Sequence, residues 1–436
     1  MVAFVAVALI AVALPLLFRF YDYNRFIQIP YWTVWSYCYL FPESTLNQCS
    51  AESLHSLSQW TREQFRWELE EYQPGQVYAV PELKLEEFSY ENLGKVSKGF
   101  TLPVVVRGLF KGTKAQTTWS HEFFADKYGE NILVTLSEGR PDKQYATGDT
   151  FKGSTGGSRD IRGKGYQNIM KPVKMKIKNA LKYMSQGEKL YISNVDTIFR
   201  RNNDLLDDLE FNRVVNWAYE PYVPYAAQIF LGYGSKDIND TTGTLMHSAA
   251  SANLFLQVKG GKDWTLLPPR YSIFIQPSLG FFTPAAKAAK KPSDSGVPLF
   301  KVSLNEGDML FNPPWMWHEV KNREGLSVGV ATRENHPTWI VKNNWLFSAL
   351  LEIRATPRVA KLMIPENQKA LRFMTSIPYL TFAIGLVTEL IKGPGPHPVF
   401  TAAFNPCDEH DPNGCTTTFL DKTVYSDDVE AIPYRE

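Results

Sequence analysis

The feature that most constrains the fold is a series of short apolar runs, separated by turn residues, that begins near residue 226. The runs cover 227–232, 253–258, 264–267, 308–312 and 326–331. Strands spaced this closely favour an antiparallel barrel or jelly roll. Helical patterns lie on either side, at 50–72, 119–128, 173–185, 204–210 and 348–371. The predicted class is α+β with a mainly β core and flanking helices.

Length and composition indicate one main domain with extensions. The chain has 436 residues, of which 44% are apolar and 14% aromatic, enough to bury one large core or two smaller ones. We divide it into an anchor at 1–25, an arm and helical leader at 26–98, the barrel at 99–345 and a helical tail at 346–436. The net charge is +1 and long basic runs are absent from the sequence, which argues against a dedicated nucleic-acid-binding protein.

Two apolar segments point to a membrane. Residues 1–18 contain no charged side chain and approach the length that crosses a bilayer; the lack of a basic leader favours a retained anchor over a signal peptide. The aromatic run 26–41 suits either a membrane interface or a buried arm on the globular domain. Residues 373–391 form either a second span or a buried or membrane-surface helix, because Pro378 and Glu389 interrupt their apolar character.

The sequence leaves two alternatives for the side of the membrane on which the barrel lies. If both apolar segments span, the flanking Lys and Arg residues predict a barrel facing cytoplasm, matrix or stroma. If only the first spans, the barrel lies in a lumen. The cysteine pairs Cys38 with Cys49 and Cys407 with Cys415 fit disulfides in that lumen or four free thiols in a reducing compartment. We therefore expect a membrane-bound protein of the endomembrane system or an organelle.

A polar segment at 139–165 is rich in glycine, serine and charged residues. It lacks the glycine spacing of phosphate-binding loops, so we interpret it as an exposed insertion or a mobile lid.

Two histidines raise the question of a metal site. His247 opens the stretch 243–269, which reads as strands joined by a tight glycine turn, and His318 lies in a second strand-turn-strand pattern at 307–320. Either histidine alone is better explained as a core residue. Non-haem iron oxygenases, however, place two histidines and one carboxylate on adjoining strands of such a barrel.

At these residues the chain resembles the JmjC and cupin-like Fe(II)/2-oxoglutarate oxygenases, especially the asparaginyl-hydroxylase-like branch. The resemblance runs from about 102 to 337 and implies a double-stranded β-helix barrel. Its general part is 103–108, Trp119 and Tyr128; its specific part is Thr244, His247, Asn253, Phe255, Gln257, 259–262, 267–269, 307–308, Pro313, Trp317 and His318.

The resemblance also implies the roles of individual residues. His247 and His318 would hold Fe(II), Thr244 and Lys262 would bind the distal carboxylate of 2-oxoglutarate, and Asn253 would lie beside that cosubstrate. A lysine buried in a barrel needs an anionic partner, which the cosubstrate's carboxylate would supply.

One residue departs from the family pattern, and the functional interpretation depends on how that departure is explained. The metal-binding carboxylate belongs two residues after the first histidine, and Ala249 stands there. A substitute ligand would preserve hydroxylation; Asp237, Asp240 and Glu319 are near in sequence, but strand alternation turns Glu319 away from His318.

Two further interpretations follow from the alanine. A halide such as chloride could fill the position, as in iron/2-oxoglutarate halogenases, or catalysis could be lost while the barrel persists. We favour the last, a non-catalytic or structural subunit of a membrane protein complex. The halogenase-like or hydroxylase activity is the alternative, with an unknown substrate.

Overall fold

A computed structural model describes the chain in segments that cover most of the barrel. The described residues are 23–40, 51–130, 132–137, 171–188, 190–195, 198–199, 204–210, 226–236, 242–277, 296–334, 339–340 and 342–348.

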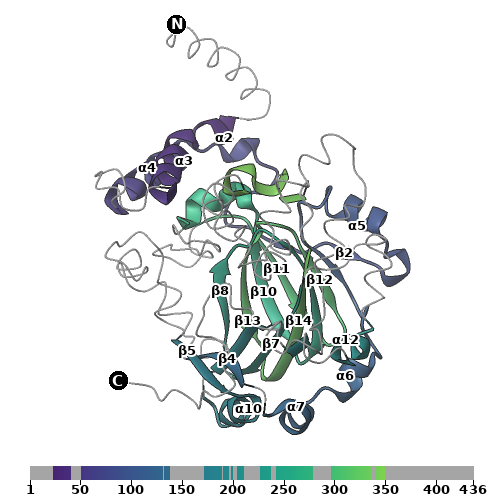
Figure 1. Cartoon of the computed structure of the whole chain (residues 1–436). Coiled ribbons are helices and arrows are strands. Elements are labelled where there is room, and N and C mark those ends of the chain that lie inside the picture. The colour runs from purple at the N-terminus through teal and green to yellow at the C-terminus, as the bar shows by residue number, and fades with distance from the viewer. Residues whose placement is uncertain are drawn as a thin grey trace, which may run out of the picture.

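Two β-sheets face each other and form the body of the domain (Figure 1). The five-stranded sheet has the order β1 (Val77–Ala79), β11 (Leu299–Leu304), β10 (Lys262–Leu267), β13 (Trp317–Asn322) and β8 (Gly243–His247). The nine-stranded sheet has the order β2 (Glu82–Leu83), β3 (Val104–Val106), β12 (Met309–Asn312), β9 (Ala252–Lys259), β14 (Gly325–Glu334), β7 (Ala226–Gly234), β6 (Leu190–Val195), β4 (Ile132–Ser137) and β5 (Lys171–Lys176).

From β8 to β14 the chain alternates between the two sheets, except that β10 and β11 pair with each other in the five-stranded sheet. β8, β10 and β13 belong to the five-stranded sheet, whereas β9, β12 and β14 belong to the nine-stranded sheet. The glycine turn after β9 therefore makes no hairpin: Gly260, with a φ of 62°, carries the chain across to the opposite sheet. Strands that alternate between two facing sheets are typical of a jelly roll. The predicted α+β class with a mainly β core is confirmed.

The space between the sheets is filled by side chains from both. Alternation along each strand sends every second residue into this interior. The buried interior residues are Val80, Leu102, Val105, Tyr191, Phe230, Phe255, Trp264, Leu266, Phe300, Val302, Leu304, Leu310, Met316, Val320 and Ala331.

Short helices cover the outer face of the nine-stranded sheet. They are α5 (Tyr90–Val96), α6 (Lys114–Thr118), α7 (His121–Tyr128), α10 (Ile177–Ser185) and α12 (Asp204–Asp208). Ser89, Thr113 and Ser120 each cap the following helix by accepting a backbone N–H bond. The prediction of a helix from residue 173 was wrong at its start, because 171–176 pair with β4 as strand β5.

The N-terminal arm packs on the outside of the five-stranded sheet. It comprises α2 (Tyr23–Phe26), α3 (Ile29–Leu40) and α4 (Ala51–Gln64). These helices contact the 3₁₀ helix η4 (Pro269–Ile275). After α4 the chain forms two more 3₁₀ turns, η2 (Trp67–Leu69) and η3 (Leu85–Glu87). Trp35 is buried, donates through Nε1 to the Pro277 carbonyl at 2.9 Å and stacks on Phe347 at 5.3 Å between ring centroids. In the described part of the 26–41 run, one face of α3 thus packs against the domain, while Tyr37 on the same helix is 39% exposed.

A buried carboxylate fastens this arm to the barrel. Glu70 accepts hydrogen bonds from Asn24 at 2.6 Å, Arg270 at 2.6 Å and Tyr271 at 3.0 Å. Cys38, the one cysteine among the described residues, is buried and disulfide-bonded. The pairing of Cys407 with Cys415 lies outside the described residues.

Several other expectations also fall outside the described residues: the apolar segments 1–18 and 373–391, the polar segment 139–165, and Asp237 and Asp240. Within the described part of the chain, every helix is too short or too polar to cross a bilayer.

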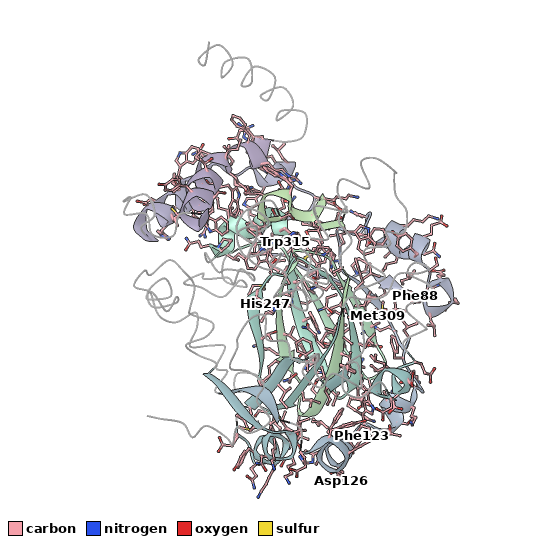
Figure 2. The ribbon with its side chains drawn as sticks, in the orientation of Figure 1. Phe88, Phe123, Asp126, His247, Met309 and Trp315 are labelled. Atoms are coloured by element: carbon pink, nitrogen blue, oxygen red, sulfur yellow. The ribbon has the colours of Figure 1, made fainter. Side chains whose placement is uncertain are left out.

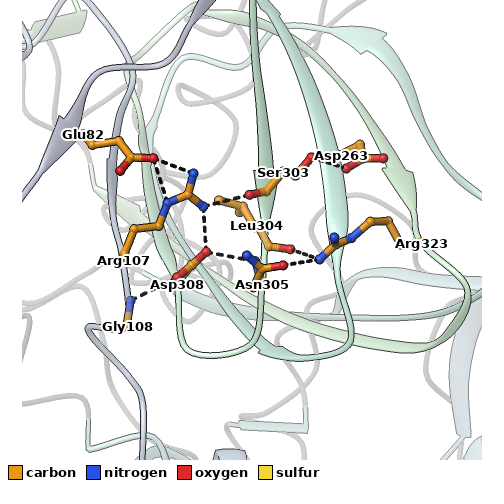
Figure 3. Close-up of polar contacts among 9 residues, drawn as sticks. All are labelled: Glu82, Arg107, Gly108, Asp263, Ser303, Leu304, Asn305, Asp308 and Arg323. Atoms are coloured by element: carbon orange, nitrogen blue, oxygen red, sulfur yellow. Dashed lines mark hydrogen bonds and ion pairs between the residues drawn. The ribbon is translucent and has the colours of Figure 1, made fainter.

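An ionic network closes the end of the barrel that carries the β11–β12 turn (Figure 3). The Asp308 carboxylate accepts from Arg107 Nη1 at 2.8 Å, from the Gly108 N–H at 3.0 Å and from the Asn305 N–H at 2.9 Å. Arg323 donates to the Leu304 carbonyl at 2.8 Å, and its own N–H bonds the Gly261 carbonyl at 2.9 Å. The network thereby fixes the turn from which β10 begins.

Candidate functional site

His247 and His318 lie side by side on neighbouring strands. They are directly paired residues of β8 and β13, and their ring centroids are 4.2 Å apart. Figure 2 places His247 on the same side of the domain as Trp315 and away from Phe123. The predicted approach of the two histidines is therefore present in the structure, at a separation that lets both imidazoles reach one ion.

A β-bulge adds Thr244 to the same face. In a regular strand, residues three apart point to opposite faces. Here His318 pairs with His247, and Val320 pairs with Thr244. The paired positions are two residues apart on β13 and three residues apart on β8, so β8 carries one extra residue, which is a β-bulge. Since His318 and Val320 share a face, their partners Thr244 and His247 share it too.

The hydrogen bonding of His318 suits a metal ligand. Its Nδ1 lies 2.8 Å from the Met316 carbonyl oxygen and 3.3 Å from the Asn312 amide nitrogen; in the tautomer that donates from Nδ1 to the closer carbonyl, Nε2 keeps its lone pair for a metal ion. Metal-ligating histidines commonly donate their second ring nitrogen in this way. The Trp264 indole stacks on the imidazole at 5.6 Å and 23°, and only 3% of His318 is exposed, so the ring is held in one orientation.

Lys262 is a buried cation in the barrel interior. Its side chain is fully buried, its Nζ donates to Asn322 Oδ1, and the ammonium lies 5.4 Å from the centre of the Tyr191 ring. Burial lowers the pKa of Lys262 from 10.5 to about 7, because loss of hydration disfavours the charged ammonium. Asn322 is itself held by a 2.8 Å bond from its amide to Thr242 Oγ1.

Other buried polar atoms in the interior lack a partner. Asn253 is 2% exposed, and its Oδ1 finds no hydrogen bond among the described residues; the same holds for the Trp264 indole N–H. Each unsatisfied group of this kind costs about 1–3 kcal/mol unless a ligand or water satisfies it. Together with two imidazoles and a buried ammonium, these atoms fit a divalent metal ion and a carboxylate-bearing ligand.

No described neighbour of the two histidines supplies a third metal ligand. Ala249 follows β8, and its carbonyl accepts from the Trp315 N–H at 2.6 Å. Glu319 lies on the opposite face of β13 from His318, as alternation predicts. Among the described residues no group of three His, Cys, Asp or Glu side chains forms a metal site.

Residues 99–332 match the family model of the cupin-like domain, which spans more than half of the chain. The chain belongs to the cupin-like family. This match supports the resemblance to cupin and JmjC proteins and the class of 2-oxoglutarate oxygenase folds that they share. No curated protein is similar enough to this cupin-like chain to count as a match.

Sequence reasoning missed one residue of the cupin-like site, Asn322. It lies four positions after His318 on the same strand, so alternation alone places both on the interior face. The pairing of Asn322 with Lys262 across β10 and β13 is non-local and carries no sequence signal.

Proposed function

We propose that this cupin-like domain binds a divalent metal ion through His247 and His318 and a 2-oxoacid through Lys262, as a site of the 2-oxoglutarate oxygenase type. The observation that carries the proposal is Lys262, a fully buried lysine whose only polar contact among the described residues is an amide oxygen. Burying an ammonium without an acid is unfavourable, and the distal carboxylate of 2-oxoglutarate would supply the missing charge.

The remaining residues support the same pocket. Thr244 and His247 of β8 lie on the same interior face, opposite Val320 and His318 of β13. The Asn253 amide oxygen, which has no hydrogen bond among the described residues, offers a further polar contact. Iron(II) with a bound 2-oxoacid would supply activation of O₂ for oxidation of a C–H bond. The protein's part is to hold the oxoacid between Lys262 and the histidines and to keep the His318 imidazole oriented.

Ala249 decides which chemistry the site supports. Its methyl side chain leaves a coordination position that an exogenous ligand, water or chloride, would fill. A second candidate is therefore a non-catalytic subunit of a membrane complex, which the absence of a third metal ligand among the described residues favours. The two candidates share the fold and the ligand pocket and differ in turnover.

Binding is tested on the full-length protein by calorimetry with Co(II), as a redox-stable substitute for Fe(II), and with 2-oxoglutarate. We expect His247→Ala to lose metal binding and Lys262→Met to lose oxoacid binding while it keeps the metal. The matched control is Lys301→Met, on an exposed position of β11. Unchanged metal content in His247→Ala, or unchanged 2-oxoglutarate affinity in Lys262→Met, would contradict the proposal.

Turnover separates the two candidates. With Fe(II), an active site would couple the conversion of 2-oxoglutarate and O₂ to succinate and CO₂ with oxidation of a substrate: one oxygen atom enters succinate and the other serves to oxidise the substrate C–H bond. Chloride dependence identifies a halogenase-like centre. Ala249→Asp should remove that chloride dependence. Binding without any succinate in the wild-type protein, followed by succinate formation in Ala249→Asp, would establish the non-catalytic subunit.

A further inference from the structure

Two buried amides lie on the sheet opposite the two histidines. Asn312 of β12 and Asn253 of β9 are directly paired residues of the nine-stranded sheet, and each is 2% exposed. Asn312 shares its face of the strand with Leu310, two positions before it. Asn253 shares its face with Phe255 in the same way. Since Leu310 and Phe255 pack in the barrel interior, both amides point into that interior as well.

Each of these amides carries an oxygen without a partner. Asn312 Oδ1 and Asn253 Oδ1 are buried, and neither accepts a hydrogen bond from the described residues. A buried polar atom that has lost its water and gained no partner destabilises the folded state. Directly paired residues on antiparallel strands have Cβ atoms about 4.5–5.5 Å apart, so the two amides lie within reach of each other.

The contact between Asn312 and His318 bears on the orientation of the first amide. The Asn312 nitrogen lies 3.3 Å from His318 Nδ1, which is also 2.8 Å from the Met316 carbonyl oxygen. In the tautomer that donates from Nδ1 to this carbonyl and frees Nε2 for a metal ion, Nδ1 is a donor. An amide nitrogen is a donor too. Two donors then face each other, so the metal-binding tautomer disfavours this orientation of the Asn312 amide.

A half-turn of the Asn312 amide removes the conflict, because it exchanges the places of oxygen and nitrogen. Oδ1 then faces His318 Nδ1 and accepts from its N–H alongside the Met316 carbonyl. The Asn312 nitrogen is turned away from the imidazole and is free to donate to Asn253 Oδ1. One rotation thus gives both unpaired oxygens a donor. Asn253 keeps its own two amide N–H groups for the pocket, which suits an anionic oxoacid.

We propose that Asn312 is a positioning residue that accepts from the Nδ1–H of His318 and donates to Asn253, and so links the metal ion to the oxoacid. The inference rests on the proposed function, because it takes His318 as a metal ligand. Groups that accept from the second nitrogen of a metal-bound histidine fix its orientation, and their loss lowers metal affinity about 10–100-fold. The Met316 carbonyl remains when Asn312 is replaced, so we expect a loss of about tenfold.

Binding of Co(II), and of 2-oxoglutarate to the Co(II) form, is measured by calorimetry on the full-length protein. Asn312→Leu keeps the side-chain size and removes both hydrogen bonds. We expect it to weaken Co(II) binding about tenfold and oxoacid binding about threefold to tenfold, the worth of one hydrogen bond. Asn312→Asp still accepts from His318 and cannot donate to Asn253, so it should keep the Co(II) affinity and weaken oxoacid binding alone.

The matched control is Thr332→Val, which removes a buried hydroxyl from the helix-covered face of the same sheet. It should leave both affinities unchanged. Circular dichroism checks that each variant is folded, and Asn312→Ala replaces Asn312→Leu if the latter is not. The inference is overturned if Asn312→Leu binds Co(II) as the control does, or if Asn312→Asp loses as much Co(II) affinity as Asn312→Leu.

A metal-free measurement separates this inference from the proposed function. ¹⁵N spectra of the histidine-labelled wild-type protein at about pH 8, where an imidazole is ordinarily neutral, distinguish a protonated from an unprotonated Nδ1. The signals of His318 are those missing from His318→Gln. We expect a protonated Nδ1. An unprotonated Nδ1 beside normal Co(II) binding overturns this inference alone, whereas a wild-type protein that binds no Co(II) overturns the proposed metal site and, with it, the link.

Discussion

Replacing Lys262 by methionine removes the buried charge from the barrel and keeps a side chain of similar length. In the folded protein burial lowers the pKa of Lys262 from 10.5 to about 7. Below pH 7 the lysine is protonated in both the folded and the unfolded state, so the folded state carries the full penalty of a buried ammonium. Between pH 7 and 10.5 the unfolded chain binds the proton and the folded chain does not, so stability rises with pH.

The size of this effect follows from the pKa. One pKa unit corresponds to about 1.4 kcal/mol, so the lowering amounts to about 5 kcal/mol in the free energy of unfolding. Methionine also leaves Asn322 Oδ1 without its donor, which costs about 1–3 kcal/mol. We therefore expect Lys262→Met to be more stable than the wild-type protein by about 2–4 kcal/mol at pH 6, and less stable by about 1–3 kcal/mol near pH 10.5.

Urea unfolding followed by circular dichroism, at pH values from 6 to 10 without metal or oxoacid, measures the difference. Lys301→Met, at an exposed position on β11, is the control and should show no pH-dependent difference. A Lys262→Met minus wild-type difference that stays constant from pH 6 to 10 would refute the burial argument.

Three further outcomes follow from the same contacts. The affinity for 2-oxoglutarate, measured by calorimetry, should fall up to about tenfold per pH unit above pH 7, because only protonated Lys262 pairs with the carboxylate; a flat profile from pH 7 to 9 would contradict this. Gly232→Ala should weaken oxoacid binding and destabilise by about 1–3 kcal/mol in urea, because its Cβ would stand 2.3 Å from the Asn322 amide; wild-type affinity would show that Asn322 does not position the lysine. Asp308→Ala should lower the free energy of unfolding by about 2–4 kcal/mol, since it leaves two backbone N–H groups without their acceptor and removes one acceptor of Arg107, which keeps Glu82 and the Ser303 carbonyl; a loss below about 1 kcal/mol would count against that network.

The local pattern predicted the central strands well. The runs 253–258 and 326–331 are mostly apolar, and they lie within strands β9 and β14. β1 and β2 were not predicted, because they are three and two residues long and exist through parallel pairing with β11 and β3 far along the chain. Local sequence holds no information on such pairing.

The residues of the site differ in how much of their placement the sequence could predict. The pairing of His247 with His318 followed from two strand patterns and a resemblance, whereas the burial of Lys262 needed the resemblance, since a lysine after a glycine turn is ordinarily solvated. The shared face of Thr244 and His247 contradicts simple alternation, because it depends on a bulge that only the register with β13 reveals.

That bulge is one of two ways in which β8 can present Thr244 and His247 together. With two intervening residues the bulge is required, because a regular strand would turn one of the pair away from the interior. With one intervening residue, a regular strand would hold both side chains on the interior face without a bulge. A library that randomises this segment should therefore recover metal-binding clones at the original length and at one residue shorter.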